Sequence, residues 1–167
     1  YEDALHSNGS VSVSGGTFAI SSGDDAVHAD GTLTISGGSF DIAASYEGIE
    51  GANITITGGT IALVSSDDGL NVNDASGLLT LAGGKITIDA GGDGIDSNGS
   101  VVMTGGTVLV SGPTDNGNGP LDYDGTFTIS GGSLVAAGSS GMAQAPGTGS
   151  SQLSLLVYYT ATQQAGT

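Results

Sequence analysis

The sequence predicts an all-β fold, a parallel β-helix (β-solenoid) with three strands and about 22 residues in each coil. Apolar and polar residues alternate with a period of two in short runs, which is the pattern of strands and not of helices. Gly-Gly pairs separate these runs at steps of 22, 21, 25, 22 and 26 residues. The pairs begin at Gly15, Gly37, Gly58, Gly83, Gly105 and Gly131. Because one unit cannot bury its own apolar face, the units are predicted to stack on one another.

Each coil is predicted to contribute three strands, with neighbouring coils one strand spacing of about 4.8 Å apart. The first strand places one apolar residue per coil in the core, namely Leu5, Val27, Ile49, Leu70, Ile95 and Leu121. The second places there Leu33 and Ile35, Ile54 and Ile56, Leu79 and Leu81, and Phe127 and Ile129. The third places there Phe18 and Ile20, Phe40 and Ile42, Ile61 and Leu63, and Ile86 and Ile88. Irregularities in the repeat fall at the corners.

The repeat predicts one β-helix of six units over residues 1–137. From about Gly138 the repeat stops, and residues 138–167 are interpreted as a Ser/Gly-rich connection followed by one further strand at 152–160. Neither end shows a capping element, so both strand edges are expected to be open, as artificial boundaries or as docking surfaces. The chain begins at Tyr1 with no leader, and it is interpreted as a mature or excised piece of a longer protein.

Composition limits the function. The chain has 167 residues with 32 Gly, no Cys and 37% hydrophobic residues, which fits one domain with a sizeable core and excludes thiolate metal sites. No run of 18 apolar residues occurs, so no membrane span is predicted. One Lys, Lys85, stands against 17 Asp and Glu, for a formal net charge of −16. Nucleic acid is therefore excluded as a partner, and multivalent cations are expected instead.

Stacking the units brings acidic residues into columns around the first strand. The corner before that strand aligns Glu2, Asp24, Tyr46, Asp67, Gly92 and Asn118. The next position aligns Asp3, Asp25, Glu47, Asp68, Asp93 and Gly119. The outward face of the strand aligns His6, His28, Glu50, Asn71, Asp96 and Asp122, and its end aligns Asn8, Asp30, Asn98 and Asp124.

Like charges about 5 Å apart cost about 1 kcal/mol per neighbouring pair even in water. Raised pKa values or a hard cation relieve this repulsion, and oxygen ligands on irregular corners suit Ca²⁺. The predicted metal ligands are Asp3, Asp24, Asp25, Glu47, Asp67, Asp68 and Asp93. The alternative is that Asp and Asn simply form good corners, and this explanation is preferred for the column that ends the first strand.

Sugar contacts are predicted on the same edge, at His28, Tyr46, Glu50, Asp96 and Tyr123. A corner Tyr is as often a packing residue, and the His6 and His28 pair can bind a metal, a sugar hydroxyl or only solvent. The second strand presents outward rows of Ser and Thr, which suit crystalline polysaccharide or ice but are also ordinary exposed strand residues. For a lyase, Lys85 is the sole candidate base, and it sits at a different corner from the acids.

Several units carry a resemblance to a known family: residues 3–9, 25–31, 46–51 and 65–70, each followed by a Gly-Gly corner, and residues 139–146. They resemble the clostridial-type carbohydrate-binding β-helix family, which is related in fold to family 9 polysaccharide lyases. The resemblance implies a secreted, right-handed, calcium-binding β-helix that binds cellulose and acidic sugars such as polygalacturonate, without established lyase activity. It assigns calcium to Asp24, Asp25, Asp67, Asp68 and Asp93.

The leading expectation is therefore a non-catalytic, extracellular, calcium-loaded module that binds polysaccharide. The main alternative is a filament subunit that stacks end to end through open solenoid edges. An ice-binding protein and a polysaccharide lyase are the two further alternatives.

Overall fold

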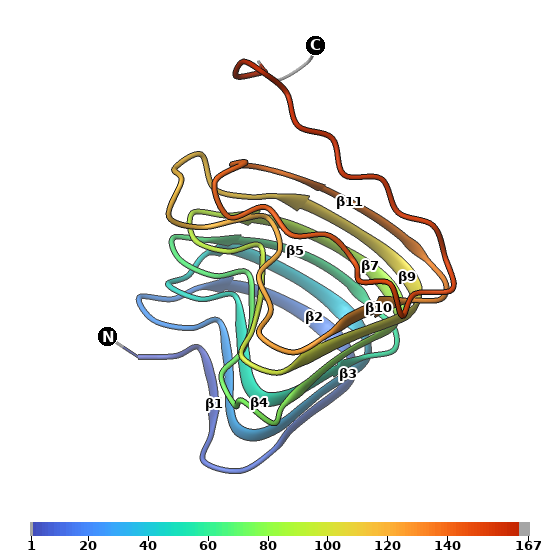
Figure 1. Cartoon of the computed structure of the whole chain (residues 1–167). Coiled ribbons are helices and arrows are strands. Elements are labelled where there is room, and N and C mark those ends of the chain that lie inside the picture. The colour runs from blue at the N-terminus through green and yellow to red at the C-terminus, as the bar shows by residue number, and fades with distance from the viewer. Residues whose placement is uncertain (1, 164–167) are drawn as a thin grey trace.

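The computed structural model describes residues 2–163, which form a β-solenoid (Figure 1). Within that range there is no helix, so none is long and apolar enough to cross a membrane. The strands are β1 (Leu5–Ser7), β2 (Val11–Ser21), β3 (Val27–Ala44), β4 (Ile49–Ile56), β5 (Thr60–Ser65), β6 (Leu70–Val72), β7 (Leu78–Ala90), β8 (Ile95–Ser97), β9 (Ser100–Ser111), β10 (Phe127–Ile129) and β11 (Ser133–Ala137).

The paired strands all run parallel and keep their register from coil to coil, which confirms the predicted fold class. On the first side the register joins, in order, Leu5, Val27, Ile49, Leu70, Ile95 and Leu121. On the third side Phe18 pairs with Phe40, and their rings stack with centroids 4.6 Å apart. The inward columns of the second side are fully buried at Leu33, Ile35, Ile54, Ile56, Leu79 and Leu81. A continuous apolar core thus holds the corners at fixed spacing.

The Gly-Gly corners join the second side of each coil to the third. The second glycine of every pair has a positive φ, from 83° to 105°, and among residues 2–163 no other residue type does. Gly106 illustrates why: its φ is +83°, and a Cβ atom there would lie 2.8 Å from the carbonyl carbon and oxygen of Gly83 in the coil below. Residues that carry a Cβ atom rarely adopt this backbone conformation, so the turn requires glycine at the second position of each pair.

Replacing Gly106 with Ala is expected to lower the free energy of unfolding by at least about 1–2 kcal/mol, from the left-handed backbone alone. The measurement is thermal unfolding followed by circular dichroism. Gly15→Ala is the matched control, because Gly15 is the first glycine of its pair and has no heavy atom within 4 Å of its added Cβ. A change within about 0.5 kcal/mol is expected there. Equal losses in the two variants would contradict this account of the corner.

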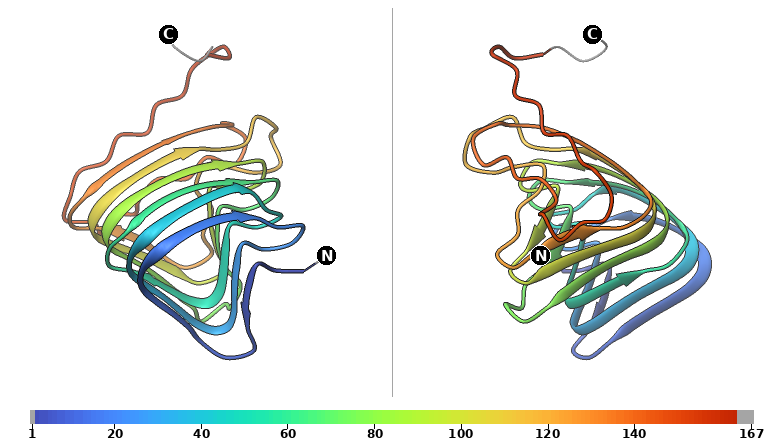
Figure 2. Two further views of the ribbon diagram at one scale, coloured as in Figure 1. Left: turned by 180° about the vertical axis from the view of Figure 1, so that it is seen from behind. Right: turned by 45° about the vertical axis from the view of Figure 1, so that its right-hand side comes forward.

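The chain after β11 covers the last coil, contrary to the expectation of an open end. Figure 2 shows this segment running across the final coil. Ser139 N–H donates to the carbonyl of Pro113 at 2.7 Å, and Gly147 N–H donates to that of Phe127 at 2.7 Å. Phe127 and Ile129 beneath are only 1% and 3% exposed. Side chains take part as well: Gln144 Nε2 donates to Asp122 Oδ1, and Ile129 N–H donates to Ser150 Oγ at 3.0 Å.

The further strand predicted at residues 152–160 is not formed. After Gln152, whose N–H donates to the carbonyl of Ile129 at 3.1 Å, the chain runs away from the solenoid (Figure 1). No strand among the described residues lies beside it to complete a ladder. Its apolar side chains are therefore exposed, 99% for Leu153 and 87% for Leu155.

Candidate functional site

The predicted acidic columns lie together along one edge of the solenoid. Backbone hydrogen bonds fix the first of them: Tyr46 N–H donates to Asp24 O at 2.9 Å, and Asp67 N–H donates to Tyr46 O at 2.9 Å. We call the acidic edge the set formed by Asp3, Asp24, Asp25, His6, His28, Glu47, Glu50, Asp67, Asp68, Asn71, Asp93, Asp96 and Asp122. These residues precede or lie on the first side of the coils, so the stacked core sets their spacing.

The second acid of each pair has a structural task that sequence reasoning did not identify. Its carboxylate accepts the backbone N–H of the equivalent residue in the next coil. Asp3 Oδ1 accepts from Asp25 at 3.1 Å, Asp25 Oδ1 from Glu47 at 3.3 Å, and Asp68 Oδ1 from Asp93 at 2.7 Å. Corner geometry thus explains part of the doubled-acid pattern. One oxygen of each carboxylate is occupied in this way, and the second oxygens of Asp3 and Asp25 contact His6 and His28.

This ladder is interrupted at Glu47, where Asn71 enters the edge. Asn71 Nδ2 donates to Glu47 Oε2 at 2.8 Å. Asn71 is only 8% exposed, and its Oδ1 has no hydrogen-bond partner among the described residues. Asp96 is the register partner of Asn71 in the next coil. A buried acceptor without a partner costs about 1–3 kcal/mol, so this position calls for a proton or a cation.

The carboxyl groups around Asn71 hold protons more tightly than usual. Burial raises the pKa of Glu47 to about 8. Burial, with the charges of Asp67 and Asp96, raises the pKa of Asp68 to about 7. Burial and the neighbouring Asp93 raise the pKa of Asp96 to about 6. Burial is the main cause of these shifts, and the repulsion expected from the sequence adds to it through the neighbouring carboxylates.

The two ends of the edge bring carboxylate oxygens close enough to share an ion. One group consists of Asp3, Asp24 and Asp25, with one oxygen from each within 4.8 Å of the others. The other consists of Asp93, Asp96 and Asp122, within the same limit. Oxygen ligands and an unsatisfied amide oxygen nearby fit Ca²⁺, which takes six to eight oxygens at about 2.3–2.6 Å. Asp122 and Asn71 were not among the predicted metal ligands, although their alignment in the outward column with Asp96 was visible in the sequence.

His6 and His28 bring imidazole groups into contact with the carboxylates of this edge. His28 Nδ1 lies 2.9 Å from both Asp25 Oδ2 and Glu50 Oε2. Burial lowers the pKa of His28, but its hydrogen bond to Asp25 and the charge of Glu50 outweigh burial and raise it. His28 and Glu50, both predicted as sugar contacts, thus contact one another. The third predicted contact in this column, Asp96, lies two coils beyond Glu50.

The comparisons with known proteins agree with this architecture. A family model described as carbohydrate-binding domain-containing protein matches residues 1–51 and 25–152. The chain belongs to this family. No curated protein and no solved structure matches it. The family supports carbohydrate as the ligand of the domain.

The two tyrosines predicted to stack on sugar occupy different environments in this carbohydrate-binding domain. Tyr46 is 49% exposed, and its hydrogen bond to Asp67 raises its pKa to about 12. Tyr123 instead packs edge-on against Phe127, with ring centroids 5.8 Å apart, and its hydroxyl donates to Ala145 O at 2.8 Å. Tyr46 therefore offers an accessible ring beside the acids, whereas Tyr123 holds the C-terminal segment against the core.

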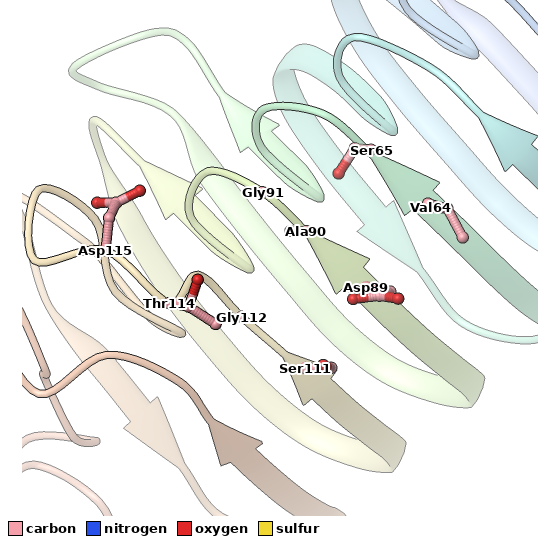
Figure 3. A pocket seen from close by; sticks show the side chains of 9 residues that line it. All are labelled: Val64, Ser65, Asp89, Ala90, Gly91, Ser111, Gly112, Thr114 and Asp115. Atoms are coloured by element: carbon pink, nitrogen blue, oxygen red, sulfur yellow. The ribbon is translucent and has the colours of Figure 1, made fainter. Parts of the chain in front are cut away.

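A shallow hollow in the domain lies at the ends of the third-side strands (Figure 3). Ser65, Asp89, Ser111, Thr114 and Asp115 line it with hydroxyl and carboxyl groups. In Figure 3 the side chains of Asp89 and Asp115 lie at opposite sides of the hollow, so they do not converge on one point. Ser65 is two residues before Asp67, and the hollow therefore adjoins the acidic edge. It extends the polar surface on which a glycan can lie.

Proposed function

We propose that this chain is a non-catalytic, calcium-loaded module that binds polysaccharide outside the cell, with cellulose or acidic sugars such as polygalacturonate as its ligands. The family supports the carbohydrate. The observation that carries the calcium is Asn71 Oδ1, a buried acceptor without a partner among carboxyl groups of raised pKa. An extracellular location accords with calcium use, since extracellular modules bind this ion with dissociation constants of about 10⁻⁴–10⁻³ M.

The residues that would hold calcium are those whose free oxygens converge. Asp93, Asp96 and Asp122 form one set, and Asp3, Asp24 and Asp25 form the other. When bound, the ion supplies positive charge that lets carboxylates of the protein and of a uronate approach one another. The backbone N–H ladder orients the protein carboxylates beforehand, as with Gly119 N–H on Asp93 Oδ1. Tyr46, exposed beside this edge, offers a ring face to a sugar.

A binding role is preferred over a lyase because of where Lys85 lies. It pairs with Thr60 and Thr107 at the beginning of the third side, directly after its Gly-Gly corner. The acidic edge follows the end of that side, beyond Ala90. At about 3.3 Å per residue, the strand places Lys85 roughly 16 Å from the corner. A base at that distance does not reach a sugar held at the acidic edge.

The test is binding to polygalacturonate and to cellulose, with calcium and with a chelator. Chelation is expected to abolish uronate binding, because two sets of carboxylates then face each other without a cation. Asp96→Asn keeps the shape of the side chain and is expected to weaken calcium-dependent uronate binding by about 10-fold, or 1.4 kcal/mol. Asp41→Asn, on the exposed third side, is the charge-matched control and is expected to bind like the wild type.

Uronate binding that survives the chelator would exclude the calcium bridge. Appearance of unsaturated sugar products, lost in Lys85→Ala, would replace the binding role by a lyase.

A further inference from the structure

The N-terminal end of the acidic edge carries nitrogen ligands that calcium does not favour. His6 and His28 are register partners on neighbouring coils, and their ring centroids lie 5.0 Å apart. Asp3 Oδ2 lies 2.7 Å from His6 Nδ1 and 3.8 Å from His28 Nδ1. These three ligand atoms all lie within 4.8 Å of one another. Farther along the same column Glu50, Asn71, Asp96 and Asp122 offer oxygen in place of imidazole nitrogen.

Both imidazoles are oriented by an oxygen behind them. His6 Nε2 lies 2.7 Å from Asn8 Oδ1, and His28 Nε2 lies 3.2 Å from Asp30 Oδ1. When Nε2–H is donated to these oxygens, the Nδ1 lone pair of His6 lies on the side of Asp3, and that of His28 lies on the side of Asp25, Glu50 and Asp3. Metal-binding histidines are oriented in this way, by an oxygen that accepts the hydrogen of the second ring nitrogen. Asn8 and Asp30 thus have a task beyond corner geometry.

The carboxylates are oriented as well. Asp3 Oδ1 and Asp25 Oδ1 accept backbone N–H groups of the next coils, which turns the Oδ2 atom of each toward the imidazoles. Oδ2 of Asp25 and Oε2 of Glu50 both lie 2.9 Å from His28 Nδ1. One ring N–H cannot serve three carboxylates at once. A divalent ion at this point satisfies more of them than a proton does.

We propose that His6, His28 and Asp3 bind a borderline transition-metal ion such as Zn²⁺, with solvent as the fourth ligand. A tetrahedral ion about 2.0–2.1 Å from each ligand places neighbouring ligand atoms about 3.4 Å apart. The separations of 2.7 Å and 3.8 Å from Asp3 Oδ2 to the two Nδ1 atoms lie on either side of that value. Two imidazoles with one carboxylate favour zinc, copper or nickel over calcium. This site goes beyond the proposed function and does not depend on the glycan. Because it shares Asp3 with the set of Asp3, Asp24 and Asp25, zinc takes the place of calcium there, and calcium keeps the set of Asp93, Asp96 and Asp122.

The experiment titrates the metal-free full chain with Zn²⁺ by calorimetry at about pH 8, in a buffer that contains calcium. One Zn²⁺ per chain is expected to bind. His6→Gln and His28→Gln are each expected to weaken zinc binding by at least about 10-fold. With Co²⁺ as the probe, the visible absorption of a four-coordinate nitrogen-ligated ion is expected in the wild type and lost in His28→Gln.

Asp93→Asn is the matched control, because Asp93 belongs to the oxygen-only group at the other end of the edge. It is expected to weaken calcium binding and to leave zinc binding unchanged. The proposal is overturned if no zinc binds in the presence of calcium, or if the His6→Gln/His28→Gln double variant binds zinc as the wild type does. Calcium-dependent uronate binding, measured in the same double variant, tests the proposed function separately from the zinc site. It persists if the zinc site alone is wrong.

Discussion

Removing calcium from the protein is expected to lower its melting temperature by about 5–10 °C. An ion present at 100 times its dissociation constant stabilises the folded state by about 2.7 kcal/mol. In a domain of this size, each 1 kcal/mol shifts the melting temperature by about 2–4 °C. The physical reason is local: without the ion, the oxygens of Asp93, Asp96 and Asp122 repel each other, and Asn71 Oδ1 stays unpaired.

Differential scanning calorimetry of dialysed protein, with and without added calcium, measures this shift. Asp96→Asn is expected to lose most of the calcium response, whereas Asp41→Asn is expected to keep it. A melting temperature that does not depend on calcium would contradict the assignment of the acidic edge as a calcium site. An equal response to magnesium would contradict its selectivity, because magnesium requires stricter octahedral geometry.

The metal-free protein is expected to be more stable at pH 5 than at pH 8. The carboxyl pKa values of Glu47, Asp68 and Asp96 are raised to about 8, 7 and 6. A raised pKa means that the folded state binds protons more tightly than the unfolded chain. The stabilisation is complete below the unfolded pKa values near 4 and is lost as pH rises through the folded values. After discounting for solvent screening, the loss amounts to about 2–3 kcal/mol.

Thermal unfolding of dialysed protein across this pH range measures the trend. Asp68→Asn is expected to reduce the pH dependence and to stabilise the metal-free protein at pH 8, because the amide oxygen can still accept the N–H of Asp93. In saturating calcium the trend is expected to reverse, since the ion favours ionised carboxylates and protons compete with it. Greater stability of the metal-free protein at pH 8 than at pH 5 would contradict the raised pKa values.

The fold could be predicted from the sequence because the same pattern of apolar residues and glycines occurs in six successive units. Alternating apolar residues specify which side chains face the core, and the glycine with positive φ marks one corner of each coil. The columns of acids followed directly, since parallel stacking places equivalent residues in register. The assignment of Asp24, Asp25 and Asp3 to one neighbourhood needed nothing beyond this register.

Three features could not be read in this way. The cap formed by residues 138–152 is held by backbone and side-chain hydrogen bonds that do not follow the repeat, so no periodic pattern announces it. Asn71 Oδ1 is left unpaired because of the orientation of one side-chain amide. That orientation is set by the hydrogen bond to Glu47 in the coil below, whose side chain is long enough to reach Nδ2. Tyr123 was predicted from its corner position as a sugar contact or a packing residue, and the hydrogen bond of its hydroxyl to the cap at Ala145 was not foreseen.

The outward column gives the solenoid a direction. It begins with imidazole at His6 and His28 and ends with carboxylate at Asp96 and Asp122. A linear glycan also has two chemically different ends. A glycan bound along this column therefore has two non-equivalent orientations. The domain is expected to bind its polysaccharide in one of them, with the reducing end always toward the same end of the solenoid.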